Sequence, residues 1–215
     1  MTFVSRILSA GLVGLLLSAS GAALAQETSA DSEAATNDAA TAELSTGTPV
    51  DGPGSVYIKS NHGDWDLRCA RAEDGSDPCE LHQVLKDESG ENPVAEITMV
   101  ALPAAPEGTP EDKKIAAGVT IVAPLESYLP EGVKIAIDGG KAKAYPFVFC
   151  TREGCVARIG LLDSEVAAMK KGNAATVTVI PAVAPDKAVN VTMSLKGFTD
   201  AFTAVTEANK PAAAE

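Results

Sequence analysis

The sequence is poor in the residues on which most enzyme chemistry depends. It has two histidines, His62 and His82, and a single tryptophan, Trp65, among 215 residues. It contains no Gly-x-Ser-x-Gly elbow, no His-Glu-x-x-His zinc motif, no Cys-x-x-Cys pair and no glycine-rich phosphate loop. We therefore predict no catalytic residues, no cofactor and no bound metal, and we expect that the protein is not an enzyme.

Basic residues are also scarce, with 17 lysines and arginines against 29 aspartates and glutamates. This balance argues against nucleic-acid binding, because neutralising phosphates requires clustered lysine and arginine. Beyond residue 25 the chain has no apolar stretch of the roughly 20 residues that a membrane-spanning helix needs. The composition therefore predicts no nucleic-acid partner and no transmembrane segment in the mature chain.

The first 25 residues have the pattern of a signal peptide. Arg6 supplies a positive charge, residues 7–17 form an apolar run, and Ala23-Leu24-Ala25 is a small-x-small cleavage site. A retained membrane anchor, the alternative, requires a longer apolar core and a basic flank. We predict cleavage between Ala25 and Gln26, with no cysteine there to carry a lipid anchor. The expected location is the periplasm, with outer-membrane association or secretion as further destinations.

Cleavage would remove 25 of 215 residues and leave 190, with 16 basic and 29 acidic groups and a net charge of −13. Residues 26–53 contain six acidic residues, no lysine or arginine and few large apolar groups. Such a segment cannot offset the entropy of ordering, so we predict a disordered acidic tail that acts as a solubilising spacer rather than a binding tail. Residues 54–206 are expected to fold, and residues 207–215 to form a flexible C-terminal tail.

Between the tails, apolar residues mostly recur at every second position, which is typical of strands with one buried face. Glycine, proline, asparagine and aspartate separate these segments at the spacing of a sandwich. We therefore predict an all-β fold, an antiparallel β-sandwich. The expected strands cover residues 65–69, 79–85, 94–102, 115–123, 133–137, 143–150, 155–162, 175–180 and 189–196.

Two short helices and one long loop complete the prediction. Asp163 or Ser164 is expected to cap a helix over residues 165–171, which Gly172 would end. Residues 103–110 are rich in proline and read as a surface loop. A second helix is expected after the last strand, where apolar side chains recur at helical spacing at Phe198, Phe202 and Val205.

The four cysteines fall into two close pairs, Cys69 with Cys79 and Cys150 with Cys155. Residues 151–154 read as a hairpin loop, so the second pair would lie opposite each other on adjacent strands. Four cysteines allow three connectivities, and we favour pairing of sequence neighbours. A zinc site is the alternative, but the export signal favours oxidation.

The order of several short motifs resembles the invasion-associated locus B family of alphaproteobacteria, over about residues 61–203. The resemblance implies an immunoglobulin-like β-sandwich in the periplasm or outer envelope, without established catalytic residues. The family name refers to host-cell invasion, which conveys no mechanism. The motifs are Gly63-Asp64-Trp65, Cys69, Cys79, Gln83, Leu129-Pro130-x-Gly132-Val133, Ile137-Asp138, Pro146-Phe147-x-x-Cys150, Gly154-Cys155-x-Ala157, Lys171-Gly172 and Ser194-Leu195-x-Gly197-Phe198.

The leading functional hypothesis is a non-enzymatic envelope accessory protein that binds an unknown envelope or host protein. The alternative is a periplasmic small-ligand or glycan-binding module, or less favourably a hydrolase, with Trp65 and Tyr128 as candidate binding residues. Trp65 precedes Leu67 and Cys69 on one strand face, which favours a core position over a sugar-stacking platform. His82 is expected to face solvent beside a disulfide.

Overall fold

The computed structural model describes residue 47 and residues 51–210, and residues 51–210 lie in one compact unit. The predicted signal peptide, its cleavage site at Ala25 and Gln26, and nearly all of the acidic tail lie outside the described residues. The last five residues of the predicted C-terminal tail lie outside them as well.

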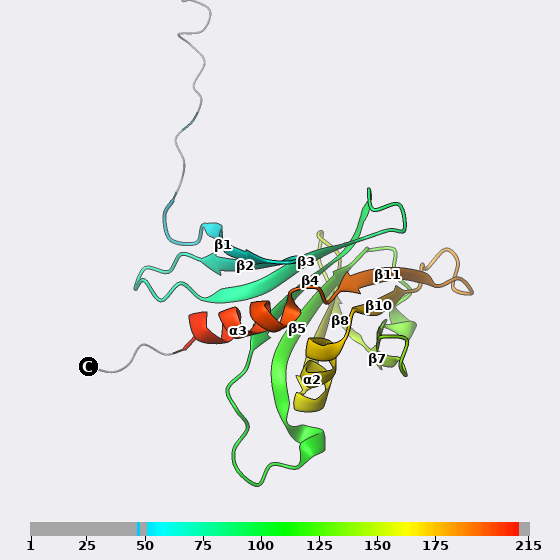
Figure 1. Cartoon of the computed structure of the whole chain (residues 1–215). Coiled ribbons are helices and arrows are strands. Elements are labelled where there is room, and N and C mark those ends of the chain that lie inside the picture. Colours follow the sequence, from blue (N-terminus) through cyan, green and yellow to red (C-terminus); the bar gives the residue numbers. More distant parts are fainter. Residues whose placement is uncertain (1–46, 48–50, 211–215) are drawn as a thin grey trace, which may run out of the picture. The chain divides into compact units, whose positions relative to one another are not determined.

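Two antiparallel sheets form most of the regular secondary structure of the described chain, as the alternation of apolar residues predicts (Figure 1). The larger sheet has the order β1 (Val56–His62), β2 (Trp65–Ala70), β3 (Cys79–Lys86), β4 (Pro93–Ala101), β5 (Ile115–Ala123), β9 (Cys155–Leu162) and β8 (Phe147–Cys150). The smaller sheet has the order β11 (Val189–Ser194), β10 (Ala174–Val179), β6 (Val133–Ile137) and β7 (Lys143–Tyr145).

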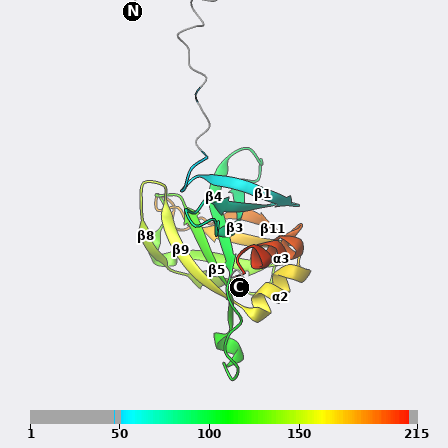
Figure 2. The ribbon, with the colours of Figure 1, turned by 90° about the vertical axis from the view of Figure 1, so that its left-hand side faces the viewer.

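The core lies between the larger sheet, the smaller sheet and two helices, α2 (Asp163–Lys171) and α3 (Phe198–Ala208). Helix α3 packs against β2, β3 and β4, whereas α2 packs against β5 and β9 and also contacts α3. Figure 2 shows both helices on the same side of the larger sheet. The helical spacing predicted for α3 is confirmed, because Phe198, Phe202 and Val205 are all buried.

The predicted strand over residues 143–150 is two strands in the structure. Residues 143–145 form β7 at the edge of the smaller sheet, and residues 147–150 form β8 at the edge of the larger one. Pro146 separates them, because proline has no N–H to continue a ladder and its fixed φ bends the chain. The chain therefore crosses from one sheet to the other at this proline.

Strand β1 was absent from the sequence prediction. Its register with β2 shifts between Ile58 and Ser60, and its exposure does not alternate along the strand. The segment is also largely polar, so it carries no period-two signal. An edge strand with a bulge needs neither alternating burial nor a regular alternation of apolar residues.

The predicted cap of α2 is also wrong in detail. The helix begins at Asp163 with Leu162 in the capping position, so neither Asp163 nor Ser164 caps it. Instead, the carboxylate of Glu165 reaches back and accepts the Leu162 N–H at 2.9 Å. This is the half of a capping box in which the N3 side chain accepts the N–H of the N-cap residue. The helix ends at Lys171, directly before Gly172, as predicted.

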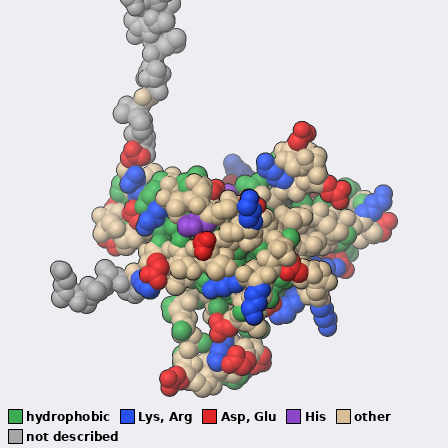
Figure 3. All heavy atoms as spheres, viewed as in Figure 1, with side chains coloured by type: hydrophobic (Ala, Val, Ile, Leu, Met, Phe, Trp, Pro, Cys, Tyr) green, Lys and Arg blue, Asp and Glu red, His purple; other side chains and the backbone are tan. Residues whose placement is uncertain are grey.

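The long connection from β4 to β5 is a surface loop, in agreement with its proline content. It extends away from the sheets in Figure 1 and contains a 3₁₀ turn over Glu111–Lys113. In Figure 3, acidic and basic side chains are interspersed over the face shown, and acidic groups gather on this loop. The exposed acids there are Glu107, Glu111 and Asp112.

Both predicted disulfides are present, Cys69–Cys79 and Cys150–Cys155, each with a Cα–Cα distance of 4.0 Å. Each joins directly paired residues of adjacent strands in the larger sheet. Each bridge therefore closes a single hairpin.

Replacing Cys150 and Cys155 together by serine should weaken the fold without abolishing it. The bridge closes a loop of only five residues in sequence separation, so it constrains the unfolded chain modestly, by about 2 kcal/mol. Urea unfolding of the oxidised protein and the double variant measures this difference. A variant without any cooperative transition would contradict the assignment of a minor, local role to this bridge.

Candidate functional site

The candidate binding residues Trp65 and Tyr128 do not form one site. Trp65 is 0% exposed, its ring lies 5.5 Å from that of Phe198, and its indole N–H donates to the Ser194 carbonyl at 2.9 Å. Tyr128 is 37% exposed and its N–H bonds to the carbonyl of Ile180. Ser194 and Ile180 lie at opposite ends of the β10–β11 hairpin. Trp65 is thus a core residue and offers no stacking surface to a ligand.

Two glycines from distant parts of the chain pack backbone to backbone beside Trp65. Gly63 has φ 61° and Gly197 has φ 82°, both in the left-handed region. A Cβ on Gly63 would lie 2.4 Å from the Lys196 carbonyl oxygen, and a Cβ on Gly197 would lie 2.3 Å from the His62 carbonyl oxygen. Only glycine permits both the positive φ and this close approach.

The buried Gln83 of β3 fastens the same place. Its amide donates to the carbonyls of Asp64 at 3.0 Å and Ser194 at 3.1 Å, and its oxygen accepts the Ser194 N–H at 2.9 Å. The Ser194 hydroxyl donates to the Asp64 carboxylate at 2.6 Å. These bonds tie the end of β11 to β3 and to the β1–β2 turn. We call this set the glycine corner: Gly63, Asp64, Trp65, Gln83, Ser194 and Gly197.

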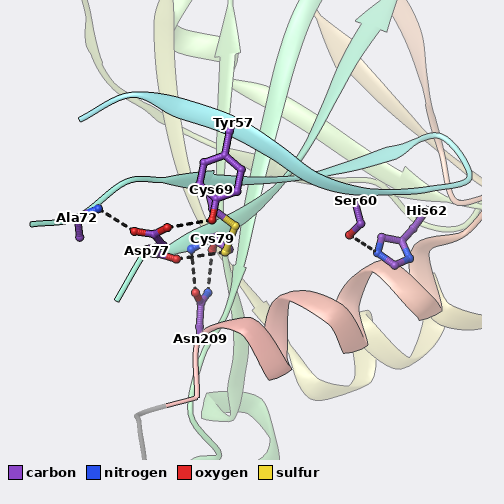
Figure 4. Close-up of a disulfide and its surroundings, with 8 residues drawn as sticks. All are labelled: Tyr57, Ser60, His62, Cys69, Ala72, Asp77, Cys79 and Asn209. Atoms are coloured by element: carbon purple, nitrogen blue, oxygen red, sulfur yellow. Dashed lines mark hydrogen bonds between the residues drawn. A yellow bond between two sulfur atoms is a disulfide. The ribbon is translucent and has the colours of Figure 1, made fainter. Parts of the chain in front are cut away.

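A second polar link joins the end of α3 to the first disulfide (Figure 4). The Cys79 N–H donates to the Asn209 side-chain oxygen at 2.8 Å, and the Asn209 amide donates to the Cys79 carbonyl at 2.7 Å. Asn209 thereby satisfies both backbone groups of Cys79 while it closes the last turn of α3. The disulfide is therefore part of the framework that holds the end of α3 to β3.

Acid should loosen the loop that this disulfide closes. The Ala72 N–H and the Tyr57 hydroxyl both donate hydrogen bonds to the Asp77 carboxylate. These bonds lower the pKa of that carboxyl, and the bond from Ala72 has the larger effect. A carboxyl whose pKa is depressed in the folded protein stabilises the folded state at pH values above its ordinary pKa. This stabilisation is lost as the pH falls through the depressed pKa. We expect the melting temperature to fall more steeply below about pH 4 in the wild type than in Asp77→Asn. Parallel curves would contradict this role of Asp77.

His82 does not face solvent as predicted but is 8% exposed. It lies on the outer face of the larger sheet, where β2 and β4 flank it on either side. Its Nε2 lies 2.5 Å from a Glu96 carboxylate oxygen. Arg68 contacts the same Glu96 at 3.3 Å and Glu80 at 3.1 Å. Long charged side chains thus cover His82. The alternation of apolar and polar residues along the strand cannot reveal such cover, because it comes from neighbouring strands.

The two strands on either side of Pro146 are both edge strands, each of a different sheet. β7 is the last strand of the smaller sheet and β8 the last strand of the larger one, so neither has a second neighbour among the described strands. In β8, Val148 is 59% exposed and Phe149 is 44% exposed. The strand itself, Phe-Val-Phe-Cys, contains no charge and no proline. Charged side chains and prolines are among the features with which proteins ordinarily protect an edge, and β8 has neither.

The opposite edge of the larger sheet differs. β1 also exposes apolar side chains, Val56 at 63% and Ile58 at 56%. However, it carries Lys59, and a charge disfavours the addition of another strand. Both edge strands have a register shift, β1 between Ile58 and Ser60 and β8 between Phe147 and Phe149, so the charge is what distinguishes them. Of the two edges, β8 is therefore the better template for strand pairing.

A cavity of about 270 Å³ lies between the two sheets and beneath α2. Its walls are mainly apolar and come from β4, β5, β6, β9, β11 and α2. Polar side chains stand among the lining residues, namely Lys141, Lys143, Tyr145, Ser164 and Glu165. The sequence prediction missed this site, because its lining comes from segments far apart in the chain.

Glu165 organises these polar groups. One carboxylate oxygen lies 2.7 Å from the Lys143 ammonium, and the other accepts the Leu162 N–H. Burial raises the pKa of Tyr145 to about 12, and the negative charge and hydrogen bond of Glu165 add to the effect. Tyr145 therefore remains a neutral hydroxyl at any physiological pH.

None of the described helices has the length and apolar character to cross a membrane. Within residues 51–210, no three histidine, cysteine, aspartate or glutamate side chains are grouped as metal ligands. The invasion associated locus B family model matches residues 65–206. The chain belongs to the invasion associated locus B family.

The resemblance drawn from the motifs is thereby confirmed. A solved structure agrees with it: invasion associated protein B from Bartonella henselae, with a TM-score of 0.57 and 18% sequence identity, covering 72% of this chain and 100% of that chain. At this identity the likeness concerns the fold alone. No curated protein sequence matches the chain significantly.

In this member of the locus B family, the motif residues mostly serve the framework. Four cysteines form the two hairpin bridges, and six motif residues form the glycine corner. Gly132 has φ 62°, and a Cβ there would lie 2.2 Å from the Tyr145 carbonyl oxygen. This close approach holds the 3₁₀ turn of residues 129–131 against the β7–β8 crossover. The motifs that identify the family therefore do not by themselves mark a binding site.

Proposed function

We propose that this locus B protein is exported to the periplasm and acts there or at the cell surface as a non-enzymatic accessory protein. It binds another envelope or host protein by pairing a strand of that partner with β8. The observation that carries the proposal is the uncharged, proline-free edge with Val148 and Phe149 exposed. Main-chain hydrogen bonds would supply the affinity and these two side chains the specificity.

The Cys150–Cys155 bridge supports this role. It fixes the end of β8 to β9, so the edge is held extended before a partner arrives. A pre-ordered edge loses less conformational entropy on binding than a flexible one. The guanidinium of Arg158 also lies over the Phe149 ring, 5.8 Å from its centroid, and steadies its orientation.

The buried polar groups of the described chain support a role without catalysis. His82 is enclosed by charged side chains on the outer face, and Gln83 is occupied by the glycine corner. The Ser127 hydroxyl donates to the Pro124 carbonyl at 2.6 Å, inside its own turn. Neither Gln83 nor Ser127 is placed beside a partner that would activate it, and the one charged partner of His82 is the carboxylate of Glu96.

A photo-crosslinking amino acid at position 148 of the full chain, expressed in the native cell, tests the proposal. We expect a discrete adduct with one protein, which disappears when Phe149→Lys places a charge on the edge. Val183 is 86% exposed on the β10–β11 connection and gives the matched control position. The same adducts from positions 148 and 183, or an adduct insensitive to Phe149→Lys, would overturn binding through β8.

Export is tested separately, by intact mass and fractionation. Protein released from the periplasm by osmotic shock should begin at Gln26 and carry no free thiol. A full-length mass in the cytosolic fraction would overturn the proposed location while leaving the β8 experiment interpretable.

A further inference from the structure

All three methionines among the described residues line the cavity between the sheets. Met99 comes from β4, Met169 from α2 and Met193 from β11, so the three reach it from different elements. Each is about 1% exposed, and apolar side chains such as Ile135 complete the walls. Methionine is unbranched and polarisable, and it adapts its shape to irregular apolar guests. The wall is therefore suited to a flexible apolar chain rather than to one rigid shape.

The opening carries a surplus of positive charge, although the protein as a whole is strongly acidic. Lys141 and Lys143 line it together with one acid, Glu165. Glu165 is already engaged by Lys143 and by the Leu162 N–H, whereas Lys141 forms no ion pair within residues 51–210. The ammonium of Lys143 has three donors and gives one to Glu165, so it retains capacity for a second acceptor. The opening therefore favours an anionic group over a cationic one.

We propose that this cavity binds a small amphipathic anion, a medium-length alkyl chain ending in a carboxylate. The chain would lie among Met99, Met169 and Met193, and the carboxylate would meet Lys141 and Lys143. The volume of about 270 Å³ equals that of roughly nine water molecules in the liquid, which suits a chain of about ten heavy atoms. The lining of this site does not include Val148 or Phe149 of the β8 edge, and the proposal does not depend on protein binding there.

Decanoate is the probe, and the methionine methyl groups are the reporters. The full chain is labelled with ¹³C at the methionine methyls and titrated with decanoate below its micelle concentration. We expect the signals of Met99, Met169 and Met193 to shift together with one saturating curve, and the melting temperature to rise. Decyltrimethylammonium, of matched chain length and opposite charge, should bind at least about tenfold more weakly.

Two neighbouring alanines of α2 give a matched pair of variants. Ala168 lines the cavity and Ala167 does not, although both are exposed. Ala168→Phe should fill the space and weaken decanoate binding at least about tenfold, whereas Ala167→Phe should leave it within a factor of two. Lys141→Glu should weaken decanoate and strengthen decyltrimethylammonium, because it reverses the charge at the opening.

Three results would overturn the proposal. They are methionine signals that do not shift, decanoate binding that Ala168→Phe and Ala167→Phe affect equally, and equal affinity for the two head groups. Because Lys141 is exposed and unpaired among the described residues, Lys141→Glu should fold normally, and this variant tests the charge preference even if Ala168→Phe proves unstable.

Discussion

Replacing Gly197 by alanine is expected to abolish stable folding, whereas the same substitution at Gly90 should cost only about 1 kcal/mol. Both glycines have positive φ, 82° and 75° respectively. A Cβ at Gly90 would meet nothing within 4 Å, but at Gly197 it would lie 2.3 Å from the His62 carbonyl oxygen. The difference between the two variants thus isolates the steric contact from the backbone strain.

Thermal and urea unfolding of the two variants measures this difference. Backbone atoms cannot move aside as a flexible side chain can, so Gly197→Ala must open the contact between the β1–β2 turn and the start of α3. If Gly197→Ala and Gly90→Ala lowered stability equally, the glycine corner would not be the tight backbone contact described above. Gly63→Ala provides an independent check from the opposite side of the same contact.

Trp65→Ala is expected to lower the free energy of unfolding by about 4 kcal/mol. The substitution removes a fully buried ring, its contact with Phe198 and the hydrogen bond to the Ser194 carbonyl. Trp65→Phe retains most of the ring packing and loses the N–H, so it should cost roughly half as much. Denaturant unfolding measures both changes in stability.

Tyr128→Ala is the companion control, because this side chain is partly exposed and lies at the other end of the β10–β11 hairpin. We expect it to change stability by less than about 1 kcal/mol. A Trp65→Ala protein as stable as the wild type would mean that the ring is not part of the core. It would also revive the interpretation of Trp65 as a platform for a ligand.

Alternating apolar residues were sufficient to predict most strands, because each has one face on a common core. The alternation did not predict the structure where edge irregularity, a proline or the cover from neighbouring strands determines it. β1 is an irregular edge, and Pro146 divides an otherwise continuous run between two sheets. His82 alternates onto the polar face as expected, yet the charged side chains of adjacent strands bury it there. Alternation predicts the face of a sheet but not how far its neighbours cover it.

The candidate sites depend on contacts that no local pattern contains. Met99, Met169 and Met193 are separated by long stretches of chain and meet only because β4, α2 and β11 all border the same cavity. The free edge at β8 follows from the strand order, which the sequence does not reveal. The disulfide pairing was predictable, because hairpin geometry brings sequence neighbours opposite each other.

The two bridges have a consequence for how the chain matures. Each cysteine is bonded to the next one along the sequence, Cys69 to Cys79 and Cys150 to Cys155. If the chain is exported as proposed, an oxidase that couples thiols in the order in which they emerge from a translocation channel would form only native bonds. The first bridge could close long before the second pair emerged, with no mispaired intermediate to resolve. Maturation of this fold should therefore require a thiol oxidase but no disulfide isomerase.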